Sequence, residues 1–360
     1  MKDLGLKFPR YSDQLRQVVQ QQVAATGTRF LFSAINPGLQ NPYAMHYQFN
    51  IQRAITSTLM VESGYVGNRG VKFILHRTPN LPDRNTGIRP NPKLVFGGYY
   101  VDNSQNTSYN AWQTSVRKRF SHGFSYDGHY TFSKTLGVSG GDIGAYYGAD
   151  NSSNNIQNFD NPRADRGPNG GDATHRMVAD WIYEVPRFTG ANRLMRSALG
   201  GWEVSGIFNA RSGGRDTVTM SCTSGQFCRP DYLGGSTSFA NWKENGTTRC
   251  IVGARCTIQY LNPAAFALVP LSPISKSAIR PGNLGQGSIR GPATWSMDAS
   301  VSRNFKIGEK TNLQFRADMF NATNHVNYSG PTTSLNSATF GQISGTGSMR
   351  VIQLNGKLRF

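Results

Sequence analysis

The chain has 360 residues and a formal net charge of +18, with 38% hydrophobic, 11% aromatic and 16% charged residues. No apolar run approaches the roughly 18 residues that a transmembrane helix requires, which excludes a helical membrane protein. The aromatic content argues against a disordered chain, and 40 glycines among many Asn, Ser and Thr residues are typical of β-strands joined by long loops.

Along the chain, hydrophobic and polar residues repeatedly alternate with a period of two. In the first such segment, Met45, Tyr47 and Phe49 alternate with His46 and Gln48. This pattern indicates a β-strand with one apolar face and one polar face. About nine strands are predicted in this way, over residues 44–54, 58–67, 109–120, 123–136, 175–186, 201–211, 294–306, 311–321 and 349–360.

The connections between these predicted strands differ regularly in length. A soluble β-sandwich also alternates in polarity, but it has no reason to sort its connections by length. Long loops on one side, short turns on the other and aromatic residues near strand ends are typical of an outer-membrane β-barrel. We therefore predict an all-β, antiparallel transmembrane β-barrel with long extracellular loops and short periplasmic turns. The short connections lie near 55–57, 121–122, 187–200 and 307–310, and the long ones at about 68–108, 137–174, 212–293 and 322–348.

Four cysteines lie within the third long connection and form two pairs with five residues between the members of each. Structural zinc sites usually have cysteines separated by two to four residues, so zinc is the weaker interpretation. Two disulfides indicate an oxidising compartment. The simplest pairing is Cys222–Cys228 and Cys250–Cys256, but the sequence does not choose among the three possible connectivities.

Several motifs then follow one another in an order that resembles the C-terminal barrel portion of Oar-like TonB-dependent outer-membrane receptors. Together they span about residues 44–360. They are Tyr-Val-Gly-Asn-Arg-Gly at 65–70, Tyr-Asn-Ala-Trp-Gln-Thr-Ser-Val-Arg-Lys-Arg-Phe-Ser-His-Gly at 109–123, Tyr-Thr-Phe-Ser-Lys at 130–134, Thr-His-Arg-Met-Val-Ala-Asp-Trp-Ile-Tyr-Glu-Val-Pro at 174–186, Leu-Gly-Gly-Trp-Glu-Val-Ser-Gly-Ile at 199–207, Leu-Asn-Pro-Ala-Ala-Phe at 261–266, Arg-Gly-Pro at 290–292, and Leu-Gln-Phe-Arg-Ala-Asp-Met-Phe-Asn-Ala-Thr-Asn-His at 313–325.

The resemblance implies a 22-stranded barrel with an N-terminal plug, energised by the TonB complex, that imports a bulky nutrient. Residues 1–43 would then be the remnant of an extracellular loop, and residues 44–360 the C-terminal strands and loops. We find no plug, TonB box or signal peptide in this sequence, so contact with TonB would need a missing N-terminal region. The alternative is a structural or adhesive outer-membrane β-protein without active transport.

The C-terminal strand resembles the signal that the β-barrel assembly machinery reads. An exposed terminal strand can pair with a sheet edge, which is the physical basis of strand addition. The alternative is an ordinary closing strand that happens to end in Phe. The residues expected to form the signal are Ile352, Leu354, Leu358 and Phe360.

We expect no enzymatic activity, cofactor or metal site, because the six histidines fall on different segments without ligand spacing. Nucleic acid is also not expected as a partner, since the basic residues are scattered and the strongest cluster is only Arg117-Lys118-Arg119. Outer-membrane lipid would contact the apolar face. Charged residues that alternate toward the lumen are expected to contact plug or water: Arg176, Glu184, Asp298, Arg316 and Asp318.

Overall fold

The structure is a computed structural model of the chain, which has no bound ligand. It describes residues 33–77, 83–88, 99–138, 156–158, 161–188, 198–222, 227–244, 257–307 and 311–360, together with residues 21, 190 and 192. Among these residues, no helix is both long and apolar enough to cross a membrane.

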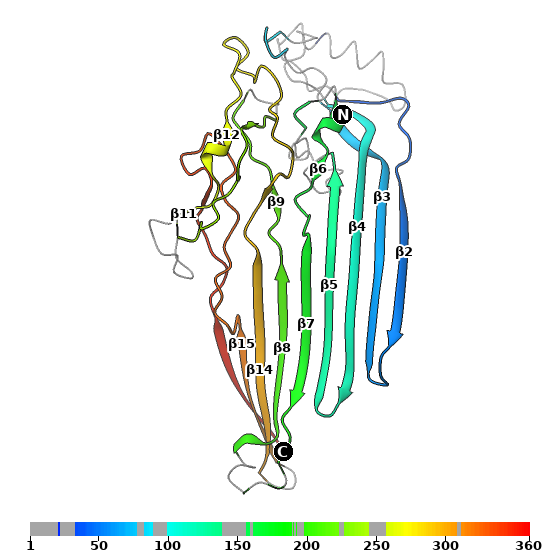
Figure 1. Cartoon of the computed structure of the whole chain (residues 1–360), viewed down its shortest axis with the longest axis vertical. Helices are drawn as coiled ribbons and strands as arrows, with labels where there is room; N and C mark the ends of the chain where they lie inside the picture. Colours follow the sequence, from blue (N-terminus) through cyan, green and yellow to red (C-terminus); the bar gives the residue numbers. More distant parts are fainter. Residues whose placement is uncertain are drawn as a thin grey trace.

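Within the described ranges, nine long strands follow one another as an antiparallel meander, in the order β17-β15-β14-β8-β7-β5-β4-β3-β2 (Figure 1). Each matches one of the segments of alternating polarity, so the all-β antiparallel prediction is confirmed. The strands are β2 (Tyr43–Ala54), β3 (Leu59–Arg77), β4 (Tyr99–Ser121), β5 (Phe124–Gly137), β7 (His175–Glu184), β8 (Trp202–Arg211), β14 (Thr294–Lys306), β15 (Asn312–Phe320) and β17 (Val351–Arg359).

The strand register keeps the apolar side chains of neighbouring strands on one face. Across the first four strands, Phe49 is opposite Tyr65, Tyr65 opposite Trp112, and Trp112 opposite Phe132. A slip of one residue would exchange the two faces of a strand, so the alternating pattern specifies this register strongly. The sheet therefore has one mainly apolar face and one mainly polar face.

Two positions require glycine, Gly123 in a tight turn and Gly206 opposite a large aromatic ring. His122 (φ 54°) and Gly123 (φ 75°) form the two-residue turn between β4 and β5, and positive φ at both positions suits the right-handed twist of a hairpin. On the apolar face, Gly206 lies opposite Trp181. A Cβ at Gly206 would be 2.4 Å from the indole Cζ2 atom, so only glycine leaves room for this ring position.

The connections are segregated by length, as predicted. The short turns after β2, β4, β7 and β14 lie at the end of the sheet where the C-terminus lies, and the long loops lie at the opposite end (Figure 1). We call the end of the sheet with the short turns the turn end and the opposite end the loop end.

The predicted loop at 68–108 is wrong in its bounds, because β3 continues to Arg77 and β4 begins at Tyr99. Ladder pairs such as Gly70–Thr107 and Leu75–Asp102 extend the hairpin, with register shifts between Gly70 and Leu75. A β-ladder needs an apolar face only where it contacts lipid or a core. The β4 part of this extension, at 102–108, is polar, whereas Leu75 of β3 is buried with Val138 and Ile156. The ladder therefore continues through residues that lack the alternating signal.

The other long connections carry a hydrophobic core of their own. The described parts of residues 156–174, 212–293 and 321–350 pack together and are named here the loop layer. Its short elements are η3 (Pro162–Asp165), β6 (Gly167–Pro168), η4 (Pro263–Ala265) and the strand pairs β9 (Arg215–Asp216) with β13 (Ile289–Arg290), β10 (Asp231–Tyr232) with β12 (Phe266–Ala267), and β11 (Ile258–Gln259) with β16 (Gln342–Ile343). Its largest buried cluster comprises Val218, Tyr260, Leu261, Ala265, Phe266, Leu284, Ile289, Phe340 and Ile343.

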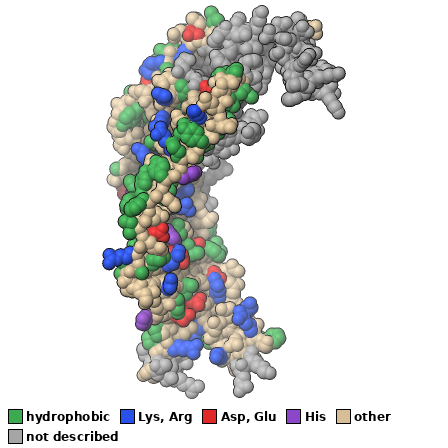
Figure 2. Space-filling model, turned by 90° about the vertical axis from the view of Figure 1, so that its right-hand side faces the viewer, with side chains coloured by type: hydrophobic (Ala, Val, Ile, Leu, Met, Phe, Trp, Pro, Cys, Tyr) green, Lys and Arg blue, Asp and Glu red, His purple; other side chains and the backbone are tan. Residues whose placement is uncertain are grey.

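The two end strands of the meander have one neighbour each among the described strands. Every residue of β2 and of β17 is exposed, and the molecule is curved when it is viewed from the β2 side (Figure 2). In residues 1–43, the described part contains β1 (Ser33–Ile35), which pairs in parallel with β4. Residues 1–20 and 22–32 lie outside the described residues.

Candidate functional site on the polar face below the loop layer

Several charges on the polar face compensate one another within the sheet. Asp127 accepts a hydrogen bond from Arg117 Nε at 2.9 Å, and its other carboxylate oxygen lies 3.1 Å from His129 Nε2. Near the C-terminus, Arg316 Nε lies 2.8 Å from Asp318, which also accepts from Asn355 Nδ2 at 3.2 Å. These groups therefore have partners on neighbouring or nearby strand positions.

The remaining charged residues predicted on this face lie on β7 and β14. Asp298 Oδ1 accepts the backbone N–H of Asn321 at 2.8 Å, which joins β14 to the start of the last long connection. Glu184 is exposed at the turn end of β7. Arg176 is exposed near the loop end of the same strand, where a cavity opens.

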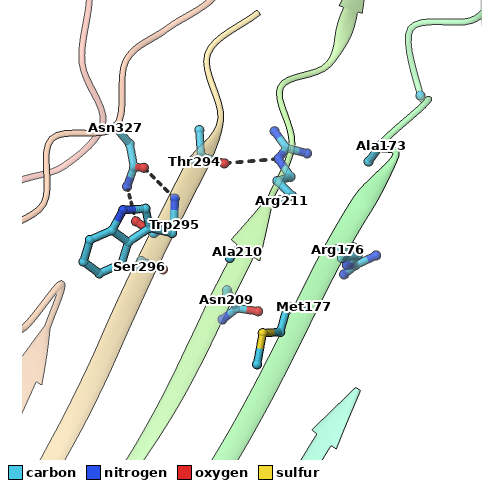
Figure 3. Close-up of a pocket in the computed structure, with 11 residues that line it drawn as sticks. Ala173, Arg176, Met177, Asn209, Ala210, Arg211, Thr294, Trp295, Ser296 and Asn327 are labelled. Atoms are coloured by element: carbon cyan, nitrogen blue, oxygen red, sulfur yellow. Dashed lines mark hydrogen bonds between the residues drawn. The ribbon is translucent and has the colours of Figure 1, made fainter. Parts of the chain in front are cut away.

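This cavity, of about 350 Å³, lies where β7, β8 and β14 meet the loop layer (Figure 3). Asn327, which lines the cavity, is hydrogen-bonded to the backbone of β14. Its side chain accepts a hydrogen bond from the Trp295 N–H and donates one to the Trp295 carbonyl, both at 2.9 Å. The side chains of Arg176, Asn209, Arg211, Thr294 and Ser296 belong to the polar face by their register.

Two arginines lie side by side at this cavity, since Arg176 on β7 is the direct register partner of Arg211 on β8. On the outer sides of this pair, Arg176 is the register partner of Thr131 on β5, and Arg211 is the register partner of Thr294 on β14. Neither threonine carries a charge. Arg211 Nε donates to Thr294 Oγ1 at 3.4 Å. Like charges placed directly opposite on adjacent strands repel each other, so the arrangement costs free energy unless an anion compensates it.

Two further arginines, Arg215 and Arg290, are partners in the β9–β13 pair of the loop layer. Arg290 Nη2 donates to Thr174 Oγ1 at 2.6 Å, and Arg215 Nε lies 3.3 Å from the buried carboxylate of Asp172. The pKa of Arg290 is lowered, because burial and the charge of Arg215 disfavour its protonated form. The negative charge of Asp172 opposes this shift.

A buried polar cluster ties two parts of the loop layer together. Arg229 and Asp165 form an ion pair whose side chains are 2% and 0% exposed. The other oxygen of Asp165 accepts the backbone N–H groups of Gln157 at 3.0 Å and Asn158 at 3.2 Å. Gln157 also donates from Nε2 to the Gly282 carbonyl at 2.7 Å. Segments far apart in the sequence therefore share one desolvated polar network.

Of the predicted disulfide cysteines, Cys222 and Cys228 are bonded in the structure, with their Cα atoms 6.3 Å apart. Both belong to the loop layer, where Cys228 packs in a small buried cluster with Met220, Val269 and Ala278. Cys250 and Cys256 lie outside the described residues.

The residues of the predicted assembly signal share the apolar face at the exposed edge of the sheet. Ile352, Leu354 and Leu358 lie opposite Met319, Ala317 and Leu313 of β15. Phe360 follows the strand and is 95% exposed. The edge strand thus presents a row of apolar side chains, interrupted at Gly356, to its surroundings.

The sequence predicted Arg176 on the polar face of its strand but did not bring it together with Arg211. Their juxtaposition depends on the register between β7 and β8 and could have been found by aligning the two predicted strands about their turn. Among the residues that the structure describes, no group of three or more His, Cys, Asp or Glu side chains has the arrangement of a metal site.

The model of one protein family, the outer membrane beta barrel domain, matches residues 4–353. Among solved structures, the chain is similar to the outer membrane transporter YddB from Escherichia coli (11% identity, TM-score 0.43, 92% of this chain and 35% of that chain). It is also similar to FpvA of P. aeruginosa (10% identity, TM-score 0.43, 89% of this chain and 27% of that chain). A third similar structure is BauA, the ferric preacinetobactin receptor from Acinetobacter baumannii (9% identity, TM-score 0.41, 88% of this chain and 29% of that chain). The chain spans about a third or less of the length of these proteins. No curated protein matches it. On the family match, the chain belongs to the outer membrane β-barrel domain family.

Proposed function

We propose that the chain is the C-terminal part of the barrel of a TonB-dependent receptor that imports a bulky nutrient across the outer membrane. Its strands would supply barrel wall, its polar face would line the lumen, and the loop layer would take part in substrate binding. The observation that carries the proposal is the polar cavity at the loop end, where exposed arginines meet a layer of loops with its own core. The family match and the motifs at 65–325 that resemble Oar-like receptors support it.

The completed barrel would need strands beyond this meander. Backbone N–H and C=O groups cannot remain unpaired in lipid, so the free edges of β2 and β17 require partners. We propose that these partners belong to the same 22-stranded barrel and that the TonB complex acts through an N-terminal region with a plug. Outer-membrane lipid would cover the apolar face.

Uptake measurements test the proposed function. In a strain that lacks the coding region of this chain, uptake of labelled ferric chelates, oligosaccharides, peptides and cobalamin is compared with uptake in the parent, with and without functional TonB. We expect one class of nutrient to lose its uptake equally in the deletion strain and in the TonB-deficient parent. If no nutrient is affected and attachment of cells to surfaces falls regardless of TonB, the structural or adhesive alternative is correct.

We also propose that the C-terminal strand is read by the β-barrel assembly machinery. Replacing Phe360 with alanine removes the exposed apolar ring at the end of the row formed with Leu358 and Leu354, and should lower the amount of assembled protein several-fold. Assembly is measured in outer-membrane fractions as protein that resists extraction by urea. Lys357→Ala, on the polar face of the same strand, is the matched control. Equal amounts of both variants would show that the strand is an ordinary closing strand.

A further inference from the structure

We propose that Arg176 and Arg211 form a binding site for a carboxylate or phosphate group of a water-soluble ligand at the loop end of the polar face. The inference rests on the proposed function, because it takes this face to line an aqueous lumen. It goes further in naming the chemical class of the ligand group.

The first argument is the uncompensated charge of the pair. Arg176 and Arg211 are both exposed and stand directly opposite each other on adjacent strands. Among the described residues, neither has a carboxylate within ion-pair distance, in contrast to Arg117 and Arg316 on the same face. The repulsion between them is a cost that an anionic ligand would remove.

The second argument concerns two carboxylates on neighbouring parts of the chain, Asp172 and Asp180, which are already engaged or too far away. Asp172, 1% exposed, accepts the Thr135 backbone N–H at 2.7 Å and contacts Arg215. Asp180 lies four residues along β7 from Arg176, a distance of about 13 Å at roughly 3.3 Å per strand residue. Neither carboxylate can neutralise the pair without giving up its contacts or its position.

The third argument is the shape and chemistry of the cavity. Its volume of about 350 Å³ lies within the range of small-molecule clefts, roughly 300–1,000 Å³. Two guanidinium groups offer planar, bidentate donors that match carboxylate and phosphate oxygens. The amide of Asn209 and the hydroxyls of Thr294 and Ser296 add neutral donors and acceptors for the rest of the ligand.

Two other arginines near the cavity, Arg215 and Arg290, also favour the binding of an anion. Arg290 contacts Thr174, two residues before Arg176, and Arg215 lies within the β9–β13 pair that follows β8. Arg215 and Arg290 are direct register partners, so two further positive charges lie beside each other where the loop layer meets the sheet. An incoming anion would therefore be attracted toward the cavity from the loop end.

The test uses the protein purified from outer membranes in detergent, with citrate and inorganic phosphate as probes in titration calorimetry at constant ionic strength. We expect Arg176→Gln and Arg211→Gln each to weaken citrate binding at least tenfold, and the double variant to abolish it. Arg211→Lys retains the charge but loses the bidentate geometry, so its affinity should be intermediate. Arg119→Gln removes an exposed arginine from the turn end of the same face and should bind as the wild type does.

Two further outcomes would overturn the proposal. One is that the wild-type protein binds neither probe, or that the double variant binds citrate within twofold of the wild type. The other is that a short-chain anionic phospholipid binds while citrate does not, which would assign the arginines to a lipid headgroup. Far-UV circular dichroism verifies that each variant is folded. Neither outcome affects the uptake test of the proposed function, which does not depend on the charge of the nutrient.

Discussion

Replacing Asp165 with asparagine should destabilise the loop layer by about 3–5 kcal/mol, the usual cost of removing one partner of a buried ion pair. Arg229, at 2% exposure, would keep its charge without a counterion, and the new amide would accept the Gln157 and Asn158 N–H groups less strongly. Because this cluster joins the connection before β7 to the one after β8, both segments should loosen together. Hydrogen exchange and limited proteolysis of intact cells would measure this.

Asp231→Asn provides the matched control in the same layer. Asp231 is hydrogen-bonded to Arg280, whose side chain is 52% exposed, so water can replace the lost contact. The effect on proteolysis should be much smaller, since exposed ion pairs contribute little to stability. Equal protection of the loops in the wild type and the Asp165→Asn variant would show that the buried cluster does not hold the layer together.

Val301→Arg should prevent or strongly reduce assembly, whereas Ser300→Arg should be tolerated. Val301 lies on the apolar face between Val204 and Ala317, and Ser300 lies on the polar face between Ser205 and Asp318. An arginine that faces lipid near the bilayer midplane costs roughly 2–4 kcal/mol, whereas one that faces the lumen does not. Folding into lipid bilayers, followed by urea titration, would compare the free energies of unfolding.

The Ser300→Arg variant is the control for size and charge, because it introduces the same side chain one residue away. A stabilising contact with Asp318 could even raise its stability slightly. If the two variants lost equal amounts of stability, the faces of β14 would not differ in their surroundings. If only Ser300→Arg lost stability, the assignment of the two faces would be reversed.

Much of the long-strand architecture could be predicted because its signal is local. Met45, Tyr47 and Phe49 alternate with polar neighbours within a few residues, and a period of two identifies the strand and its faces together. The alternation did not predict that β3 extends beyond Gly67, because the strand continues to Arg77 through residues without a regular period of two. The ladder is maintained there by backbone pairing and by the burial of Leu75 against Val138 and Ile156. These partners are distant in the sequence, so the local pattern does not report them.

The loop layer was not predictable as a folded unit. Val218, Leu261 and Phe340 share one buried cluster, yet they are scattered among Gly, Pro, Asn and Ser residues that suggested only polar loops. The pairing of β11 with β16 joins residues more than eighty positions apart. Such contacts have no period along the chain, because each isolated hydrophobic residue finds its partners only after the meander has brought the connections to one end.

The amino-acid sequence by itself determined the long strands, the face on which each side chain lies and the segregation of short turns from long connections. These properties follow from local polarity and from the alternate directions of successive side chains in a strand. Only the tertiary structure decided that Arg176 stands opposite Arg211 and that Asp165 meets Arg229. Those contacts depend on strand register and on the packing of distant loops, which no local pattern encodes.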